Sequence, residues 1–93
     1  MAIVHINKTV ATSATALTTL DAVTEYTAVS IQNNDTATIY VGDNTISTSG
    51  VNRGHAVANG TTFQIWLRAN DTVYAISAAG TAANAVSVLY SQV

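Results

Sequence analysis

A two-residue period in hydrophobicity is the feature that most constrains the fold of this 93-residue chain. From Ala2 to Val10, and again from Glu25 to Asn33, large apolar residues alternate with smaller or polar ones. Successive side chains of a β-strand point to opposite faces, so this pattern predicts strands with one buried face. Thr, Val, Ile and Tyr, which suit a pleated surface, occupy many of these positions. We therefore expect an all-β protein.

Turn residues divide the rest of the chain into further short strands. Asn and Asp accept positive φ and bond their own backbone, so runs of them mark turns. We place turns at 33–35, 42–44, 59–60, 70–71 and around 80, and a Gly-bounded loop at 49–54. The Asn59-Gly60 pair is the strongest hairpin signal and predicts that its two flanking strands pair with each other. The expected strands are Ala37–Gly42, Thr45–Thr48, His55–Ala58, Thr61–Leu67, Thr72–Ala78 and Ala85–Tyr90.

Strands that recur every 8–12 residues or so with turn signals between them indicate a small antiparallel β-sandwich or barrel of the jelly-roll type. A chain of this length makes one domain, so we expect a single β-sandwich domain over residues 1–93. The segment Thr12–Val23 is ambiguous, because its Ala and Leu spacing fits a helical turn while its many Thr residues disfavour one. We treat it as a loop or short strand. An alternative for residues 1–24 is a partly extended N-terminal arm that reaches a partner.

Charge is scarce in this chain. Charged residues make up 9% of it and hydrophobic residues 48%, whereas an average soluble domain is about 25% charged. The polar remainder is mostly Thr, Ser and Asn. Burying such side chains costs little when their hydrogen bonds are remade, whereas burying unpaired Lys or Glu costs several kcal/mol. We therefore expect a surface that other protein subunits cover.

The same composition excludes several classes of partner. Three basic residues and a net charge of −2 do not match the phosphates of nucleic acid. No stretch approaches the ~20 apolar residues of a membrane span, and the first residues lack the basic and apolar regions of a signal peptide. Synthesis in a cytoplasm is expected. Without Cys there is no disulfide and no thiolate metal site.

No combination of residues predicts an enzyme. Catalysis needs a nucleophile beside a base or a close pair of carboxylates, and neither His5 nor His55 is placed for such a role. Asp35, Asp43 and Asp71 each lie in a turn beside Asn, where they could contribute to a calcium site. They lack EF-hand spacing, and Asp in turns is ordinary turn chemistry. We expect no catalytic residue, no metal and no cofactor.

Trp66 is the clearest candidate for a contact with another molecule. Strand alternation places it with Gln64 and Arg68 on the face opposite the core residue Ile65. An indole there is a subunit contact, a sugar platform or a residue covered by a loop, and the enrichment of Trp and Arg at interfaces favours a contact. The loop at 50–55 is either a mobile surface loop or a docking loop. The candidate interface residues are Trp66, Arg68, Tyr90, Arg53 and His55.

Four segments of the chain form a familiar combination: Ile39–Asp43, Thr61–Ile65, Val73–Thr81 and Val86–Leu89. Together they resemble small β-rich virion proteins of tailed bacteriophages. In that group a YVGD strand and a VYAISAxGT strand precede a hydrophobic last strand, and the likeness covers residues 26–92. Where many such proteins have a Pro-Gly turn followed by an acidic residue, this chain has Ala58-Asn59-Gly60-Thr61, so a contact made by that acidic residue is not carried over.

The resemblance implies a β-sandwich and a structural role in a virion. The expected function is that of a capsid cement or decoration protein, a homotrimer on the capsid surface that binds the major capsid protein. It would be made in the cytoplasm of the bacterial host. One alternative is a fibre, tail or adaptor component of the phage. Another, of a different class, is a carbohydrate-binding β-sandwich that uses Trp66 with Tyr40 or Tyr74.

Overall fold

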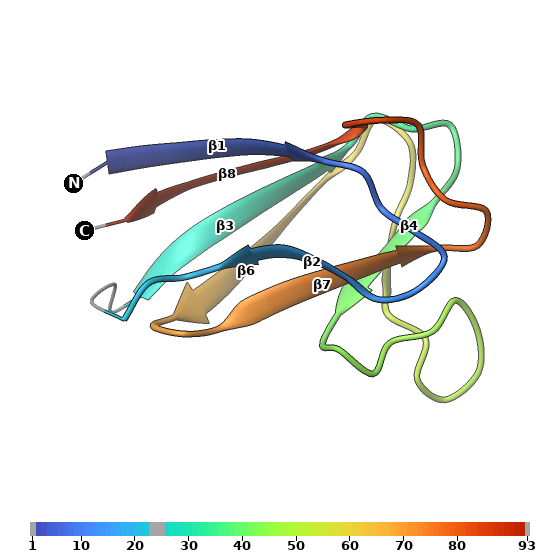
Figure 1. The fold of residues 1–93 in the computed structure, drawn as a ribbon, viewed down its shortest axis with the longest axis horizontal. Helices are drawn as coiled ribbons and strands as arrows, with labels where there is room; N and C mark the ends of the chain where they lie inside the picture. The colour runs from blue at the N-terminus through green and yellow to red at the C-terminus, as the bar shows by residue number, and fades with distance from the viewer. Residues whose placement is uncertain (1, 23–25, 93) are drawn as a thin grey trace.

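The computed structural model describes residues 2–22 and 26–92 of the chain. Within them, eight strands form two four-stranded antiparallel sheets packed face to face (Figure 1). Sheet A has the strand order β1-β8-β3-β6, and sheet B has the order β2-β7-β4-β5. The prediction of a single all-β sandwich domain is confirmed. The strands are β1 Ala2–Lys8, β2 Thr15–Thr19, β3 Tyr26–Asn33, β4 Ile39–Gly42, β5 His55–Val57, β6 Thr62–Arg68, β7 Thr72–Ser77 and β8 Val86–Gln92.

This strand order is that of an eight-stranded jelly roll. Consecutive strands cross from one sheet to the other, except that β4 and β5 pair within sheet B. The first strand pairs with the last along its whole length, from Ala2 with Gln92 to Lys8 with Val86. In Figure 1 the start of β1 and the end of β8 accordingly lie side by side at one end of the sandwich. No helix long and apolar enough to span a membrane occurs in residues 2–22 and 26–92.

The core lies between the inner faces of the two sheets and follows the two-residue period. In β3, Val29 and Ile31 are fully buried, while the neighbouring Ser30 and Gln32 point outward. The other buried apolar side chains of the core are Val10, Leu17, Leu20, Ile39, Val41, Val57, Leu67, Val73, Ala75, Val86, Val88 and Tyr90.

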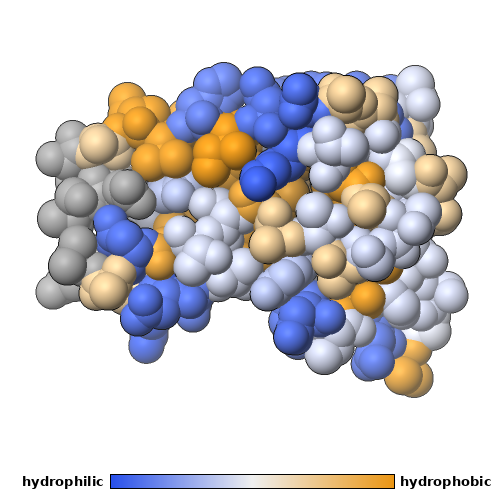
Figure 2. All heavy atoms as spheres, in the orientation of Figure 1, coloured by the Kyte–Doolittle hydropathy of each residue, from blue (hydrophilic) through white to orange (hydrophobic). Residues whose placement is uncertain are grey.

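Four apolar side chains on the two outermost strands of sheet A are only partly buried. Val4 and Ile6 on β1, and Phe63 and Ile65 on β6, pack against the core from its two flanks. In Figure 2 apolar side chains accordingly remain visible at the surface around β1. The sandwich is therefore less well covered at its flanks than at its centre.

The buried amide of Asn33 joins the two sheets at the end of β3. Its Nδ2 donates to the carbonyl oxygens of Ala37 and Val57 at 2.8 and 2.9 Å, and its Oδ1 accepts from the Asp35 backbone N–H at 2.9 Å. The predicted turn at 33–35 is thus an Asx turn. Because Val57 ends β5 in sheet B, the Asn33 side chain also ties sheet A to sheet B at this point.

A second polar link crosses the core between β8 and β2. The Tyr90 hydroxyl lies 2.8 Å from the hydroxyl Oγ1 of Thr18. Tyr90 is 6% exposed and its ring belongs to the core. Tyr90, one of the predicted interface residues, thus has the position and the hydrogen bond of a core residue.

The strands β1 and β2, which lie within the proposed arm, belong to the sandwich. β1 pairs with β8, and β2, within the ambiguous segment Thr12–Val23, pairs with β7. Of the proposed arm, only residues 1, 23 and 24 lie outside the described residues. The strand predicted over Thr45–Thr48 is wrong, because Ser47 makes only an isolated bridge with Arg53.

The predicted hairpin at Asn59-Gly60 is also wrong, although a turn does form there. β5 pairs with β4 in sheet B, and β6 pairs with β3 in sheet A. A type I′ hairpin turn needs positive φ at both central residues, but here only Gly60 has it, at 77°. The Gly60 N–H donates to the Asn33 carbonyl at 2.7 Å, so the turn is bonded to β3 and carries the chain from sheet B to sheet A.

Replacing Tyr90 by Phe is expected to destabilise the fold by about 1–3 kcal/mol, because the Thr18 hydroxyl then stays buried without its partner. Replacing both partners, Tyr90→Phe with Thr18→Val, should cost less than the sum of the two single changes. Chemical denaturation of the four proteins measures this coupling. If the two single effects simply add, the hydroxyl–hydroxyl bond does not contribute to stability.

Candidate interaction surface

The outer face of sheet A is a wide surface that carries almost no charge. Strand register brings the outward side chains of its four strands into adjacent rows, for example His5 opposite Leu89 and Ser30 opposite both Leu89 and Gln64. Among the described residues of this face, only Arg68, at one end of β6, is charged. The outward residues are Ile3, His5 and Asn7 on β1, Ser87, Leu89 and Ser91 on β8, Tyr26, Ala28, Ser30 and Gln32 on β3, and Thr62, Gln64, Trp66 and Arg68 on β6.

Large apolar side chains stand exposed on this face. Ile3 is 77% exposed, Leu89 49%, Tyr26 53% and Trp66 59%. Of the described residues, the remaining large hydrophobic side chain of this kind is Val51, at the tip of a loop beside sheet B. Exposed apolar groups that gather on one face indicate an interaction site, whereas single ones do not.

Trp66 belongs to an aromatic cluster at one end of the face. Its ring stacks on that of Tyr26, with centroids 4.9 Å apart and an interplanar angle of 29°. The Arg68 guanidinium carbon lies 5.7 Å from the Tyr26 centroid, within range of a cation–π contact. In the β3–β6 pair, Tyr26 lies opposite Arg68, and Ala28 lies opposite Trp66. The Tyr26 and Trp66 rings are therefore diagonal neighbours, and the small Ala28 leaves room for them to meet.

The predicted orientation of Trp66 is therefore confirmed, and the alternative that a loop covers it is wrong. Tyr26 is the functional candidate that sequence reasoning missed. Its outward position followed from the alternation of β3, but its nearness to Trp66 required knowing that β3 pairs with β6. Ile3 was missed for the same reason, since its face was predicted but its neighbours were not. Leu89 was missed because no face was assigned to the residues of the last strand.

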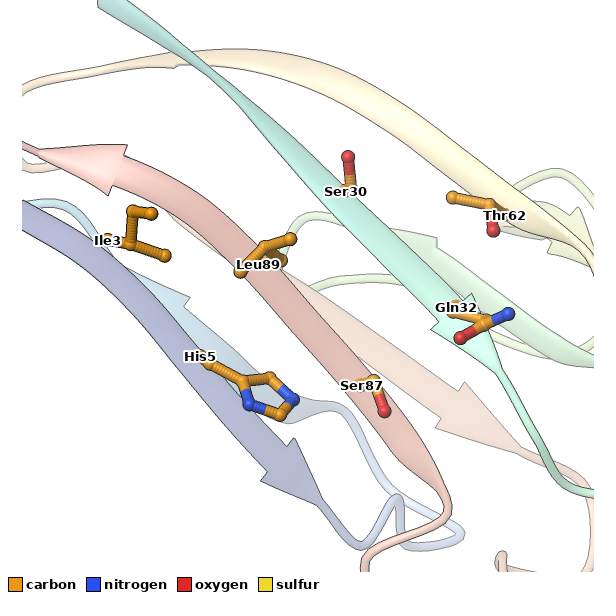
Figure 3. Close-up of a pocket in the computed structure, with 7 residues that line it drawn as sticks. All are labelled: Ile3, His5, Ser30, Gln32, Thr62, Ser87 and Leu89. Carbon is orange, nitrogen blue, oxygen red and sulfur yellow. The ribbon is translucent and has the colours of Figure 1, made fainter.

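Beside the aromatic cluster, the face is hollowed into a shallow groove of about 550 Å³ (Figure 3). In Figure 3 the side chains of His5, Leu89 and Gln32 stand on the same side of the sheet. Within the described residues, the side chains of His5, Ser30, Gln32 and Thr62 make no hydrogen bond. The lining residues are Ile3, His5, Ser30, Gln32, Thr62, Ser87 and Leu89, and none of them is Asp, Glu, Lys or Arg.

Two of the predicted interface residues, Arg53 and His55, lie elsewhere. They line a shallow hollow beside β4 with Val41, Gly42 and Asp43. The His55 ring also packs against Phe63 of sheet A, with centroids 4.4 Å apart. The structure thus brings Trp66 and Arg68 together on sheet A and separates them from Arg53 and His55.

Each of the three turn carboxylates accepts hydrogen bonds from backbone N–H groups near it. Asp43 accepts hydrogen bonds from the Thr45 hydroxyl and N–H, and Asp71 accepts one from the Arg68 N–H. Asp35 accepts from the N–H groups of Ala82 and Ala37, both at 3.0 Å. In the described part of the chain, no three His, Asp or Glu side chains come close enough to hold a metal ion.

These hydrogen bonds change the acidity of two of the carboxyl groups. The Ala82 and Ala37 N–H groups hold the pKa of Asp35 below its ordinary value of 3.8. Likewise, the Thr45 hydroxyl and N–H lower the pKa of Asp43. The Asp35 bonds are the more consequential, because they connect the turn after β3 to the β7–β8 connection.

Comparisons of the chain with protein-family models, with curated proteins and with solved structures found no match. The interpretation of this surface therefore rests on its own geometry and chemistry.

The Asp35→Asn variant is expected to be less stable than the wild-type protein at neutral pH. A lowered pKa in the folded state means that the ionised carboxylate stabilises the fold above 3.8 and that this contribution is lost as pH falls through the folded pKa. The stability difference between the two proteins should therefore shrink in acid. Denaturation curves at a series of pH values test this, and a difference independent of pH would contradict it.

Proposed function

We propose that this protein is a structural component of an assembly and that it binds other protein subunits through the outer face of sheet A. The observation that carries the proposal is the exposure of Ile3, Leu89, Tyr26 and Trp66 on one nearly uncharged face. Desolvating such a face costs little, because its polar groups are hydroxyls and amides that can exchange water for protein partners. The stacked Trp66 is the expected hot spot, with Arg68 at the rim.

The assembly we propose is the head of a tailed bacteriophage, with the protein as a capsid cement or decoration protein. This part rests on the sequence resemblance to small β-rich virion proteins. Jelly rolls occur in viral capsid and lectin domains alike, so the fold agrees with the proposal but does not choose it. The partners would be further copies of this chain in a homotrimer and the major capsid protein, and the protein would have no enzymatic activity.

Binding should depend on the side chains of the sheet A face. Trp66→Ser and Leu89→Ser are each expected to weaken binding to capsid shells prepared from a deletion mutant of the source phage by about tenfold or more. Val51→Ser removes an exposed apolar side chain away from this face and is the matched control. Sedimentation of shells with each variant measures the binding. Equal binding by all three variants would contradict the role of this face.

Copy number separates the cement role from the alternative of a fibre, tail or adaptor component. Quantitative mass spectrometry of purified particles should find this protein in the hundreds per particle if it coats the shell. A number of about a dozen would point to the tail, where closed rings of few subunits are the rule. Absence from purified particles would overturn the virion role altogether.

A second candidate function is binding of a neutral carbohydrate, and the groove beside the Tyr26–Trp66 stack favours it. An aromatic face can stack on the apolar side of a sugar ring, and Gln32, Ser30 and His5 offer hydrogen-bonding groups for its hydroxyls. The predicted platform of Trp66 with Tyr40 or Tyr74 is wrong, because those tyrosines lie on β4 and β7 of sheet B.

Fluorescence titration tests the carbohydrate function directly, because Trp66 is the single Trp of the chain. A panel of neutral oligosaccharides should quench or shift its emission if sugars stack on the ring, and Tyr26→Ala should reduce the effect. A response of the Val51→Ser control equal to that of the wild type is expected. Emission unchanged by every saccharide removes this candidate.

A further inference from the structure

The four outermost strands of the sandwich differ in how open their edges are to another strand. β1 and β6 are the edges of sheet A, and β2 and β5 are the edges of sheet B. Each edge presents a row of backbone N–H and C=O groups that can pair with an added strand. Proteins that stay monomeric usually block such edges with short strands, bulges, proline or charge.

Both edges of sheet B carry one of these blocking features. β5 is only three residues long. β2 is five residues long, and its pairing with β7 shifts register between Ala16 and Thr18. A bulge of this kind twists the strand and interrupts its regular row of hydrogen-bonding groups. An added strand would find little to pair with on either side of sheet B.

The edges of sheet A are long and regular. β1 and β6 each have seven residues, and each pairs with its inner neighbour over seven consecutive positions without a shift. Neither strand contains proline, and the charged residue of each is its last one, Lys8 or Arg68. These two edges are therefore open to pairing along most of their length.

The incompletely buried part of the core lies on these same two strands. Val4 and Ile6 face inward from β1, and Phe63 and Ile65 face inward from β6, yet all four are only partly buried. A strand added at either edge would cover the exposed side of these residues. Pairing would thus gain apolar burial as well as backbone hydrogen bonds.

We propose that β1 of one copy of this chain pairs antiparallel with β6 of a second copy, so that sheet A continues from copy to copy. Every neighbouring pair in sheet A is antiparallel, so β1 and β6 run in opposite directions. Copies placed side by side in the same orientation therefore meet as an antiparallel pair. This inference rests on the proposed function, for which it supplies the contact between copies.

Pairing of β1 with β6 accounts for more of the structure than pairing of β1 with itself. A β1–β1 contact would leave the β6 edge and the half-buried Phe63 and Ile65 exposed in every copy. A β1–β6 contact covers both edges with one type of interface. Such a head-to-tail interface closes into a ring when its rotation allows, and a ring of three would be the homotrimer that the resemblance implies.

The alternation of faces restricts the register of the new pair. Outward residues must lie beside outward residues, because a slip of one position would turn apolar side chains to the wrong side of the sheet. When the two strands also overlap along most of their length, His5 at the centre of β1 lies opposite Gln64 or Trp66 of the neighbouring copy. The half-buried Ile6 then meets Phe63 or Ile65.

Cysteine cross-linking tests the pairing, and the absence of Cys from the chain gives a clean background. The variants are His5→Cys and Gln64→Cys, alone, mixed and combined in one chain, with a short thiol-reactive cross-linker. A cross-linked dimer is expected in the mixture and not in either single variant, and the combined variant should give a ladder that ends at the trimer. Ala16→Cys mixed with Ala56→Cys, on the edges of sheet B, is the matched control and should give no product.

The other outcomes each overturn the inference. A dimer from His5→Cys alone would show β1–β1 pairing, and cross-linking through Ala16→Cys and Ala56→Cys would show that sheet B edges meet. No cross-link in any sample, from a protein that light scattering shows to be oligomeric, would exclude the edges while leaving the proposed function intact. A protein that is monomeric and absent from purified particles would contradict both.

Discussion

The structure depends on the way in which Asn33 is bonded at the end of β3. Its side chain bonds Ala37 and Val57, and its backbone N–H and C=O bond Thr61 and Gly60. One fully buried residue therefore connects the end of β5 in sheet B with the start of β6 in sheet A. Because that connection sets the register of β6 against β3, it also decides that Trp66 stacks on Tyr26. The candidate surface on the outside of sheet A follows from a hydrogen-bond network on the inside.

The few charged residues that the structure describes lie away from the middle of the sheet faces. The charged residues of the described part of the chain lie in connections between strands or at strand ends. There they bond to nearby groups, as Asp35 and Asp43 do by accepting from backbone N–H groups two residues ahead. The broad faces of the sheets are left to Thr, Ser, Asn, Gln and apolar residues. A free monomer would gain solubility from charge on those faces. The scarcity of charge in the sequence corresponds, in the structure, to a nearly uncharged outer face of sheet A, which carries Arg68 at one end and has two open edges.

Local features could be predicted from the sequence, and long-range pairing could not. The alternation in β3 and β6 predicted which way Trp66 and Ile65 point, since side-chain direction depends only on the neighbouring residues. The hairpin at Asn59-Gly60 failed because an Asn-Gly pair specifies a turn, whereas the partner of each flanking strand is set by burial across the whole domain. The position of Tyr90 could not be predicted for a related reason: which face of the last strand is buried depends on its partners in the sheet. In the structure Tyr90 lies on the buried face, bonded to Thr18.

Copies of this protein are proposed to associate through the edges of sheet A. Amide hydrogen exchange at low and high protein concentration measures this, because the edge N–H groups that point away from the sheet exchange slowly only when a strand is added there. If copies pair through β1 and β6, protection of these two strands rises with protein concentration, while protection of β2 and β5 stays constant. Protection of β1 and β6 that does not change as oligomers form would contradict it.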